Sequence, residues 1–191
     1  MGEVIQAEEV RNNIEELARM LRKAVFIHPT DTIYGIGGDA TKHNIVARIR
    51  EIKNRPIQAM SVIAPSKEWI YNNFEINEKA EEWLKKLPGP YTLILKVKKG
   101  KKPVANNVAP GLDSVGVRIP RHWISDLVRI MGRPIITTSA NIVGEEFMTS
   151  LDNLDPRIRN QVDYIIYEGE IKGRPSTIVH LEKEEVLIKE R

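Results

Sequence analysis

Short apolar runs alternate with amphipathic segments along almost the whole chain, and this alternation restricts the fold more than any other feature. The first amphipathic segment spans residues 7–23, where apolar side chains recur at helical spacing. Further helical patterns lie at 45–52, after the N-cap residues Ser66 and Asn77, and at 122–131. Apolar runs of strand length lie at 24–27, 60–64, 91–97, 115–119 and 134–138. The alternation predicts a single α/β domain over residues 1–191.

The connections between these runs predict a mixed sheet. The first connections contain helices, which suits parallel pairing of the strands that they join. After one more helix, the tail holds apolar runs at 164–167, 176–181 and 185–189. The last two are close enough in sequence to form a hairpin, which adds antiparallel pairing. Residues 98–114 are rich in proline, glycine and lysine and predict a loop.

The composition excludes several classes of protein and of site. Hydrophobic residues make up 41% of the 191 residues and charged residues 29%, which is typical of a globular protein. The absence of cysteine excludes disulfides, thiolate zinc sites and a cysteine nucleophile. No apolar run has the length of a membrane helix and the N-terminus has no signal-peptide pattern, so we expect a cytoplasmic protein without membrane partners.

Positive charge is concentrated in three short segments, although the net charge is only +3. These segments read RIREIKNRP, KVKKGKKP and RIPRH, whereas acidic residues crowd two of the predicted helices. An uneven distribution of this kind favours a site for an anion over a uniformly cationic surface.

The segment HPTDTIYGIGGDA, residues 28–40, places two threonines, an aspartate and a tyrosine just before three glycines. Its GIGGDA part satisfies the G-x-G-x-x-A pattern of a dinucleotide-binding turn. However, six residues separate the preceding apolar run from the first glycine, and no acidic residue ends the next strand, which argues against that interpretation. The segment is either a structural turn built by Thr and Asp side chains or part of a binding site.

Three further segments carry side chains suited to binding phosphate or carboxylate. Lys53 and Arg55 stand at the end of a predicted helix, where they either offset the helix dipole or bind a polyphosphate. Arg118 alternates with apolar neighbours in its strand and is either an exposed cation or a clamp for a carboxylate. The segment TTSANIVG, residues 137–144, offers hydroxyls and an amide for phosphate oxygens, for a hydrated cation or for a capping turn.

Six segments occur in an order that resembles one family. They read PTDTIYGIGGDA, IKNRP, PGPYTLIL, VGVRIPRH, PIITTSANIVG and STIV, and the resemblance covers about residues 7–181. The chain resembles the YrdC/TsaC-like family of threonylcarbamoyl-AMP synthases in its single-domain form. The resemblance implies a twisted mixed β-sheet flanked by helices, with a basic concave face. It also implies ATP with Mg²⁺, L-threonine and bicarbonate as substrates, and a separate tRNA threonylcarbamoyl transferase that uses the product.

The resemblance also implies a role for individual residues. Lys53 and Arg55 match a pair that binds the triphosphate and acts in catalysis, and Arg118 matches the residue that holds the threonine carboxylate. The other implied threonine contacts are Thr32, Tyr34, Thr138 and Ser176, and the other implied nucleotide contacts are Ser114, Ser139, Ala140 and Asn141. No protein ligand to a metal is implied. The chain departs from the family pattern at Asn54, where glycine is common, and at Ala59, where proline is usual.

None of these segments supplies an obvious nucleophile, so we expect the substrates to react with one another. A carbamate formed from threonine and bicarbonate would attack the α-phosphorus of ATP, and the protein would supply position and positive charge. Two alternatives stay open. One is a non-catalytic protein that binds double-stranded RNA or tRNA through the basic concave face, and the other is a carbamoyl-transfer module like those inside larger hydrogenase-maturation proteins.

Overall fold

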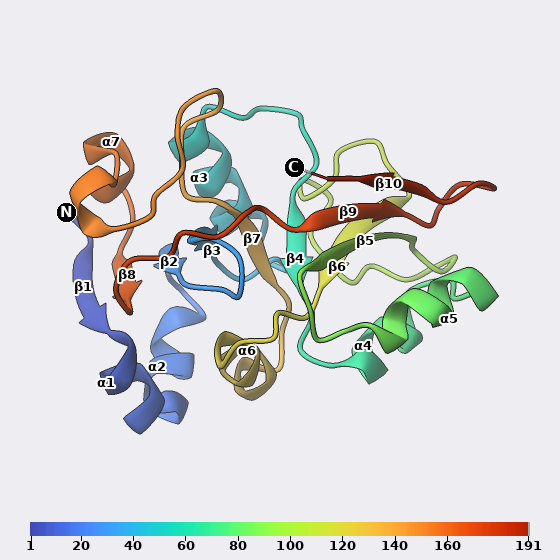
Figure 1. Ribbon diagram of the computed structural model, residues 1–191, viewed down its shortest axis with the longest axis horizontal. Helices are drawn as coiled ribbons and strands as arrows, with labels where there is room; N and C mark the ends of the chain where they lie inside the picture. The colour runs from blue at the N-terminus through green and yellow to red at the C-terminus, as the bar shows by residue number, and fades with distance from the viewer. Residues whose placement is uncertain (191) are drawn as a thin grey trace.

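The computed structural model of the chain describes residues 1–190, and their strands form one ten-stranded twisted sheet with helices on both faces (Figure 1). The strands are β1 Glu3–Gln6, β2 Phe26–His28, β3 Gly35–Gly37, β4 Ser61–Ile63, β5 Tyr91–Lys96, β6 Ser114–Arg118, β7 Ile135–Ser139, β8 Tyr164–Tyr167, β9 Thr177–His180 and β10 Leu187–Lys189. The helices are α1 Ala7–Asn12, α2 Ile14–Leu21, α3 His43–Lys53, α4 Lys67–Asn73, α5 Glu78–Lys85, α6 Ile124–Met131, the 3₁₀ helix Leu151–Asn153 and α7 Pro156–Arg159. The predicted α/β class is confirmed.

The strands follow the order β1-β8-β2-β3-β7-β4-β6-β5-β9-β10 across the sheet. Pairing is parallel between β1 and β8, β2 and β8, β4 and β6, and β5 and β9, and it is antiparallel at the other borders. The predicted mixed sheet and the predicted terminal hairpin, β9–β10, are therefore confirmed. Parallel pairing across the first helical connections is wrong, because β7 inserts between β3 and β4 and runs antiparallel to both.

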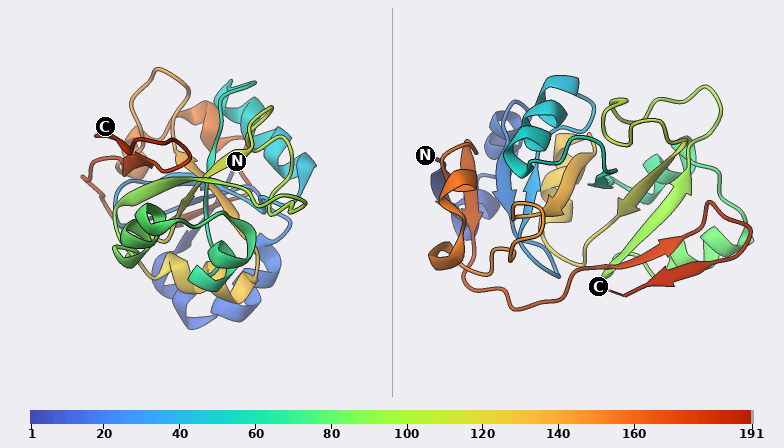
Figure 2. Two further views of the ribbon diagram at one scale, coloured as in Figure 1. Left: turned by 90° about the vertical axis from the view of Figure 1, so that its right-hand side faces the viewer. Right: turned by 90° about the horizontal axis from the view of Figure 1, so that it is seen from above.

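Neighbouring residues of the central strands face two separate apolar cores, because successive side chains of a strand point to opposite faces. Ile63 and Ile135 pack with the apolar faces of α1, α2 and α6, whereas Val62 and Ile136 pack in the core that includes α3. Figure 2 shows α1, α2 and α6 on one side of the sheet and α3 on the other. Helices therefore cover the sheet on both faces along its β1–β7 half.

The helix ends follow local capping signals. Ser66 and Asn77 each accept a hydrogen bond from the main-chain amide three residues ahead, which confirms both predicted N-caps. Gly132 ends α6 in the left-handed conformation with a φ of 67°. The single helix predicted over 7–23 is instead two, because Asn13 takes φ −126° and ψ 36° and interrupts the helical ladder.

Strand β3 lies in the glycine-rich segment, where the sequence pattern predicted no strand. Its glycines pack against the ring of His28 in β2: a Cβ added to Gly37 would lie 2.7 Å from His28 Cδ2 and 2.9 Å from the main-chain oxygen of Ile136. These glycines permit a close approach between strands, which is a known use of glycine within sheets. The segment is therefore part of the sheet and not a dinucleotide-binding turn.

Candidate active site

On the face that carries α6, the part of the sheet that this helix does not cover forms the floor of a cavity of about 400 Å³. Ile63 and Ile135 pack in the core beneath α6, whereas Ser61 and Thr137, two residues away on the same strands and the same face, line the cavity. The cavity thus begins where the helical cover ends. The predicted site residues on its wall are Tyr34, Arg55, Arg118, Thr138, Ser139 and Ser176.

Arg55 reaches the cavity from the turn that follows α3. Asn54 ends the helix in the left-handed region, with φ 51° and ψ 48°, and so redirects the chain. The Arg55 guanidinium donates to the main-chain oxygen of Ala59 at 2.7 Å and to Thr138 Oγ1 at 3.4 Å. The structure therefore places Arg55, which is predicted to bind phosphate, beside Thr138, which is predicted to contact the threonine substrate.

Lys53 lies behind the cavity wall and is 1% exposed. Its Nζ donates to the main-chain oxygens of Ser139 and Asn141 at 2.5 and 2.6 Å, and it lies 3.2 Å from Asn141 Oδ1. Burial, and then the charge of Arg55, lower the pKa of Lys53 to about 7, whereas the three oxygen acceptors favour the protonated amine. Lys53 orders the 139–141 turn in this structure, and its contact with a triphosphate stays a prediction.

The turn at 139–141 presents one hydroxyl to the cavity. Ser139 lies on the wall, and its Oγ donates to Asn141 Oδ1 at 2.6 Å, while Asn141 Nδ2 donates to the main-chain oxygen of Glu145 at 2.7 Å. Ala140 is buried and donates its amide to the main-chain oxygen of Tyr34 at 3.0 Å. Ala140 and Asn141 therefore support the turn and do not line the cavity.

Arg118 is buried at the end of β6, where its guanidinium lies between two side chains of the PTDT segment. Nη2 lies 2.6 Å from Asp31 Oδ1, and Nη1 donates to Thr32 Oγ1 at 3.2 Å. The other Asp31 oxygen accepts a hydrogen bond from the amide of Arg121 at 2.8 Å. These contacts hold the guanidinium in one orientation at the cavity and exclude the alternative of an exposed strand cation.

Two predicted serines occupy different places. Ser176 lines the cavity and shares a 2.7 Å hydrogen bond between its Oγ and Thr92 Oγ1. Ser114 begins β6 on the same strand face as Arg118, but it is not part of the cavity wall. The structure therefore brings Ser176 to the cavity wall. Ser114 lies outside the wall, at the opposite end of β6 from Arg118.

Tyr34 ties the cavity wall to the chain that follows β8. Its hydroxyl donates to the main-chain oxygen of Gly169 at 2.7 Å and accepts from the amide of Glu168 at 3.1 Å. Its ring stacks on Tyr167 with 6.0 Å between the ring centroids. Because burial raises the pKa of Tyr34 to about 12, the phenol stays protonated at neutral pH and keeps donating.

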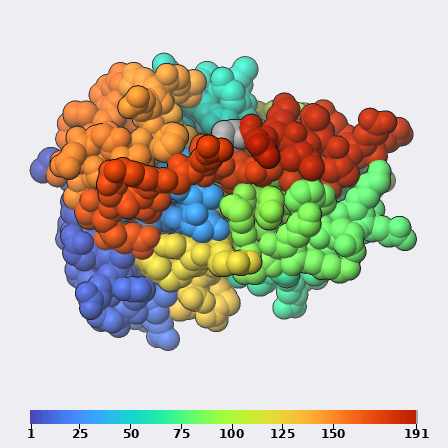
Figure 3. Space-filling model, viewed as in Figure 1, coloured from blue at the N-terminus to red at the C-terminus, as the bar shows by residue number. Residues whose placement is uncertain are grey.

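The connector between β8 and β9, residues 168–176, crosses the surface of the PTDT segment, as Figure 3 shows in orange to red in front of blue. At Gly173 the contact is very close, because an added Cβ would lie 1.7 Å from the main-chain oxygen of Thr32. The connector therefore passes directly over a predicted threonine-binding residue and fixes its main chain from outside.

Several residues of the site were not predicted from the sequence. Asp31 belongs to the PTDT segment and orients Arg118, so its position between two predicted threonines was the available signal. Thr92, His180 and Lys189 line the cavity from β5, β9 and β10. No sequence motif marks these three residues, and only the parallel pairing of β5 with β9 and the final hairpin bring them there.

Two hydroxyl groups of the cavity fit the ligand chemistry of a magnesium ion, whose binding stays a prediction. Among residues 1–190, no group of three or more His, Cys, Asp or Glu side chains is arranged to hold a metal. Ser139 and Thr138 offer hydroxyl oxygens, a ligand type that Mg²⁺ accepts beside phosphate and water oxygens.

Within the described residues, no helix has both the length and the apolar character needed to cross a membrane. The basic concave face stays a prediction.

Comparison with known proteins assigns the chain to a family. The family model Sua5_yciO_yrdC, described as Telomere recombination, matches residues 19–190. The chain belongs to the Sua5/YciO/YrdC family. A family relative from Methanocaldococcus jannaschii, named putative threonylcarbamoyl-AMP synthase, is 35% identical over 185 residues, which cover 94% of this chain and 86% of the relative. The threonylcarbamoyl-AMP synthase of Pyrococcus abyssi is 36% identical over 183 residues, which cover 90% of this chain and 53% of that relative.

Solved structures of the family share the fold. The structure of P. abyssi Sua5 complexed with L-threonine matches with a TM-score of 0.84 and 31% identity, over 98% of this chain and 56% of that one. Escherichia coli YciO matches with a TM-score of 0.84 and 22% identity, over 100% of this chain and 96% of that one, which shows the same fold. The family resemblance and the twisted mixed sheet predicted from the sequence are therefore confirmed.

Proposed function

We propose that this protein is a nucleotidyltransferase that makes L-threonylcarbamoyladenylate from L-threonine, bicarbonate and ATP, with release of pyrophosphate. The observation that carries the proposal is the convergence of Arg55, Arg118, Thr138 and Ser176 on one open cavity. Support also comes from relatives named threonylcarbamoyl-AMP synthase that align over most of the chain, and from the family structure with bound L-threonine.

Threonine would bind at the Arg118 end of the cavity. A guanidinium fork matches a carboxylate in geometry and charge, so Arg118 would hold the carboxylate of the amino acid. The fork already contacts Asp31, which keeps it oriented before the substrate arrives. Thr32, Tyr34, Thr138 and Ser176 would supply the remaining contacts on the threonine side.

MgATP would bind at the end formed by Arg55 and the 139–141 turn. Arg55 would stabilise the charge that develops on the phosphates as pyrophosphate leaves, and Lys53 would add a second cation. Ser139 would contact the nucleotide from the cavity wall, and Asn141 and Ala140 would act by holding the 139–141 turn in place. A contact from Ser114 would require the nucleotide to extend beyond the wall along β6. Magnesium would neutralise phosphate charge, coordinated mainly by phosphate and water oxygens.

The reaction would take place between the bound substrates. The threonine amine and bicarbonate form a carbamate with loss of water. A carbamate oxygen then bonds to the α-phosphorus of ATP as the bond from that phosphorus to pyrophosphate breaks. The protein would contribute proximity and fixed positive charge and would form no covalent bond to a substrate. We further propose that the product passes, in the cytoplasm, to a transferase that modifies the tRNA adenosine following the anticodon.

Pyrophosphate release measured with L-threonine, bicarbonate and MgATP tests the proposal. We expect release that falls to background when either threonine or bicarbonate is omitted, and an adenylate of the expected mass in the complete mixture. Release without threonine would contradict the proposed substrate set. Salt-sensitive binding of double-stranded RNA or tRNA without any turnover would instead favour the RNA-binding alternative. Turnover of carbamoyl phosphate in place of threonine and bicarbonate would favour a carbamoyl-transfer module.

A further inference from the structure

Arg50, on the buried side of α3, donates to four main-chain oxygens from two different loops. Its Nε donates to the oxygen of Asn107 at 2.7 Å and its Nη2 to that of Val108 at 3.2 Å. Its Nη1 donates to the oxygens of Arg55 at 2.8 Å and Gln58 at 3.0 Å. The side chain therefore joins the α3–β4 loop, residues 54–60, to the lysine loop, residues 98–113.

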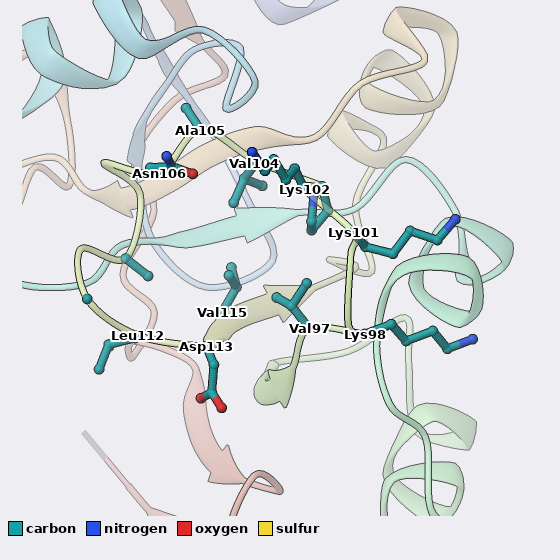
Figure 4. Close-up of a pocket in the computed structure, with 13 residues that line it drawn as sticks. Val97, Lys98, Lys101, Lys102, Val104, Ala105, Asn106, Leu112, Asp113 and Val115 are labelled. Carbon is teal, nitrogen blue, oxygen red and sulfur yellow. The ribbon is translucent and has the colours of Figure 1, made fainter.

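The lysine loop is held against α3 at this point. It surrounds a second cavity, of about 480 Å³, whose lining includes Lys98 and Lys101; Figure 4 shows these two side chains extending outward from the loop. The amide of Ala105 donates to the oxygen of Ala40 at 2.8 Å, and Asn107 Nδ2 donates to the oxygen of His43 at 2.9 Å. Residues 105–108 of the loop are thus held in place by their own hydrogen bonds, and Arg50 donates to two of their main-chain oxygens.

The α3–β4 loop carries Arg55 to the active cavity and contains no helix or strand between α3 and β4. Its main-chain oxygens at Arg55 and Gln58 both accept from the same Arg50 nitrogen, which closes the loop from its two ends. The amide of Met60 adds one bond to the oxygen of Val108 at 3.0 Å. Without Arg50, two carbonyl groups of this loop lose these donors, and among the hydrogen bonds between described residues that of the Met60 amide still links the loop to residues 105–108.

We propose that Arg50 is a positioning residue, which holds the Arg55 side chain at the phosphate end of the cavity by joining the α3–β4 loop to the lysine loop. This inference rests on the proposed function of Arg55. Arg50 is 7% exposed and touches main-chain oxygens, so it acts through Arg55 and not on substrate. A guanidinium suits the role because it offers five donors in a planar fork, whereas lysine offers its three donors from one nitrogen.

The test compares Arg50→Gln and Arg50→Lys with the control Arg48→Gln. Arg48 lies on the same helix and contacts Asp163 through Nη1 at 2.7 Å and Nη2 at 2.9 Å, so its loss also removes a multiply bonded guanidinium, but neither residue lines the cavity. We expect Arg50→Gln to raise the KM for MgATP about tenfold or more and to leave the KM for threonine within about twofold, because a displaced Arg55 loses its alignment with phosphate. Arg50→Lys should give a smaller rise, and Arg48→Gln should change neither KM.

Amide hydrogen exchange in the free protein provides a second readout that needs no activity. We expect the amides of residues 55–60 to exchange faster in Arg50→Gln than in the parent and in Arg48→Gln. The reason is that the loop opens locally when it loses its hydrogen bonds from Arg50. Unchanged exchange of this segment, or an unchanged KM for MgATP in a folded Arg50→Gln protein, would overturn the proposal. If Arg50→Gln does not fold, the same two measurements on Arg50→Lys decide it. If the parent shows no synthase turnover but residues 55–60 exchange faster in Arg50→Gln than in the parent, the proposed function is refuted. The inference that Arg50 joins the two loops would then still stand.

Discussion

The buried imidazole of His28 predicts a specific loss of stability in acid. His28 ends β2 with no exposed surface, and its ring packs against Gly35 and Gly37 of the neighbouring strand. Nδ1 lies 3.2 Å from the main-chain oxygen of Pro29, and Nε2 has no hydrogen-bond partner among the described residues. Burial lowers the pKa of His28 from 6.5 to about 4, because a charged ring would lose its hydration.

The sign of the effect follows from the lowered pKa. Below pH 6.5 the unfolded chain takes up a proton on His28 that the folded chain does not, so this contribution to stability is complete above that pH and declines as the pH falls toward 4. The full difference between the two pKa values corresponds to about 3 kcal/mol, of which about 2 kcal/mol would be lost between pH 8 and pH 5.

Urea unfolding of the parent, of His28→Gln and of the exposed-site control His43→Gln at pH 8 and pH 5 measures this contribution. We expect the parent and His43→Gln to lose about 2 kcal/mol more between the two pH values than His28→Gln does. The comparison uses only pH dependence, so a constant cost of the substitution cancels. An equal pH dependence in all three proteins would refute the reasoning, as would an NMR titration of the His28 ring with a midpoint near 6.5 in the folded protein.

Three further predictions concern the cavity and the strand beside it. Arg55→Ala should raise the barrier to pyrophosphate release by about 2–4 kcal/mol, and near-normal release would contradict its role. Arg118→Ala should mainly weaken threonine binding in calorimetry, and unchanged threonine affinity with collapsed ATP affinity would mean that the two ends of the cavity are exchanged. Gly37→Ala should lower the free energy of unfolding by about 1–3 kcal/mol, because the new Cβ meets the main-chain oxygen of Ile136 at 2.9 Å. Equal urea midpoints for that variant and the parent would show that the strand relaxes without cost.

The sequence allowed prediction of features with local causes. The caps at Ser66 and Asn77 act within one helical turn, so each is visible in a few residues. The helix predicted to end at residue 131 does so because Gly132 follows it in the left-handed conformation. The departure at Asn54 has a similar explanation. This residue takes φ 51°, a region that glycine enters freely and asparagine more readily than most other residues, so the chain keeps the turn that carries Arg55.

Features that depend on distant segments were not predictable in the same way. Strand β3 is short and rich in glycine, so its intrinsic strand propensity is low. It is a strand because it pairs with β2 and β7. The family pattern gave Lys53 a place in the site, but its burial beneath the 139–141 turn appears only in three dimensions. For the same reason the wall residues His180 and Lys189 carried no signal, since β9 and β10 reach the cavity through sheet pairing alone.

The close passage of Gly173 over Thr32 has a consequence for how the protein matures during translation. The segment with Thr32 leaves the ribosome early, yet the chain that covers it is synthesised near the end. A nascent chain that stops before residue 173 therefore lacks the segment that covers Thr32, whatever the state of its earlier strands. If the proposed function holds, a nascent chain would complete its threonine site only when the last part of the sequence has been made, and products truncated before residue 173 would be inactive.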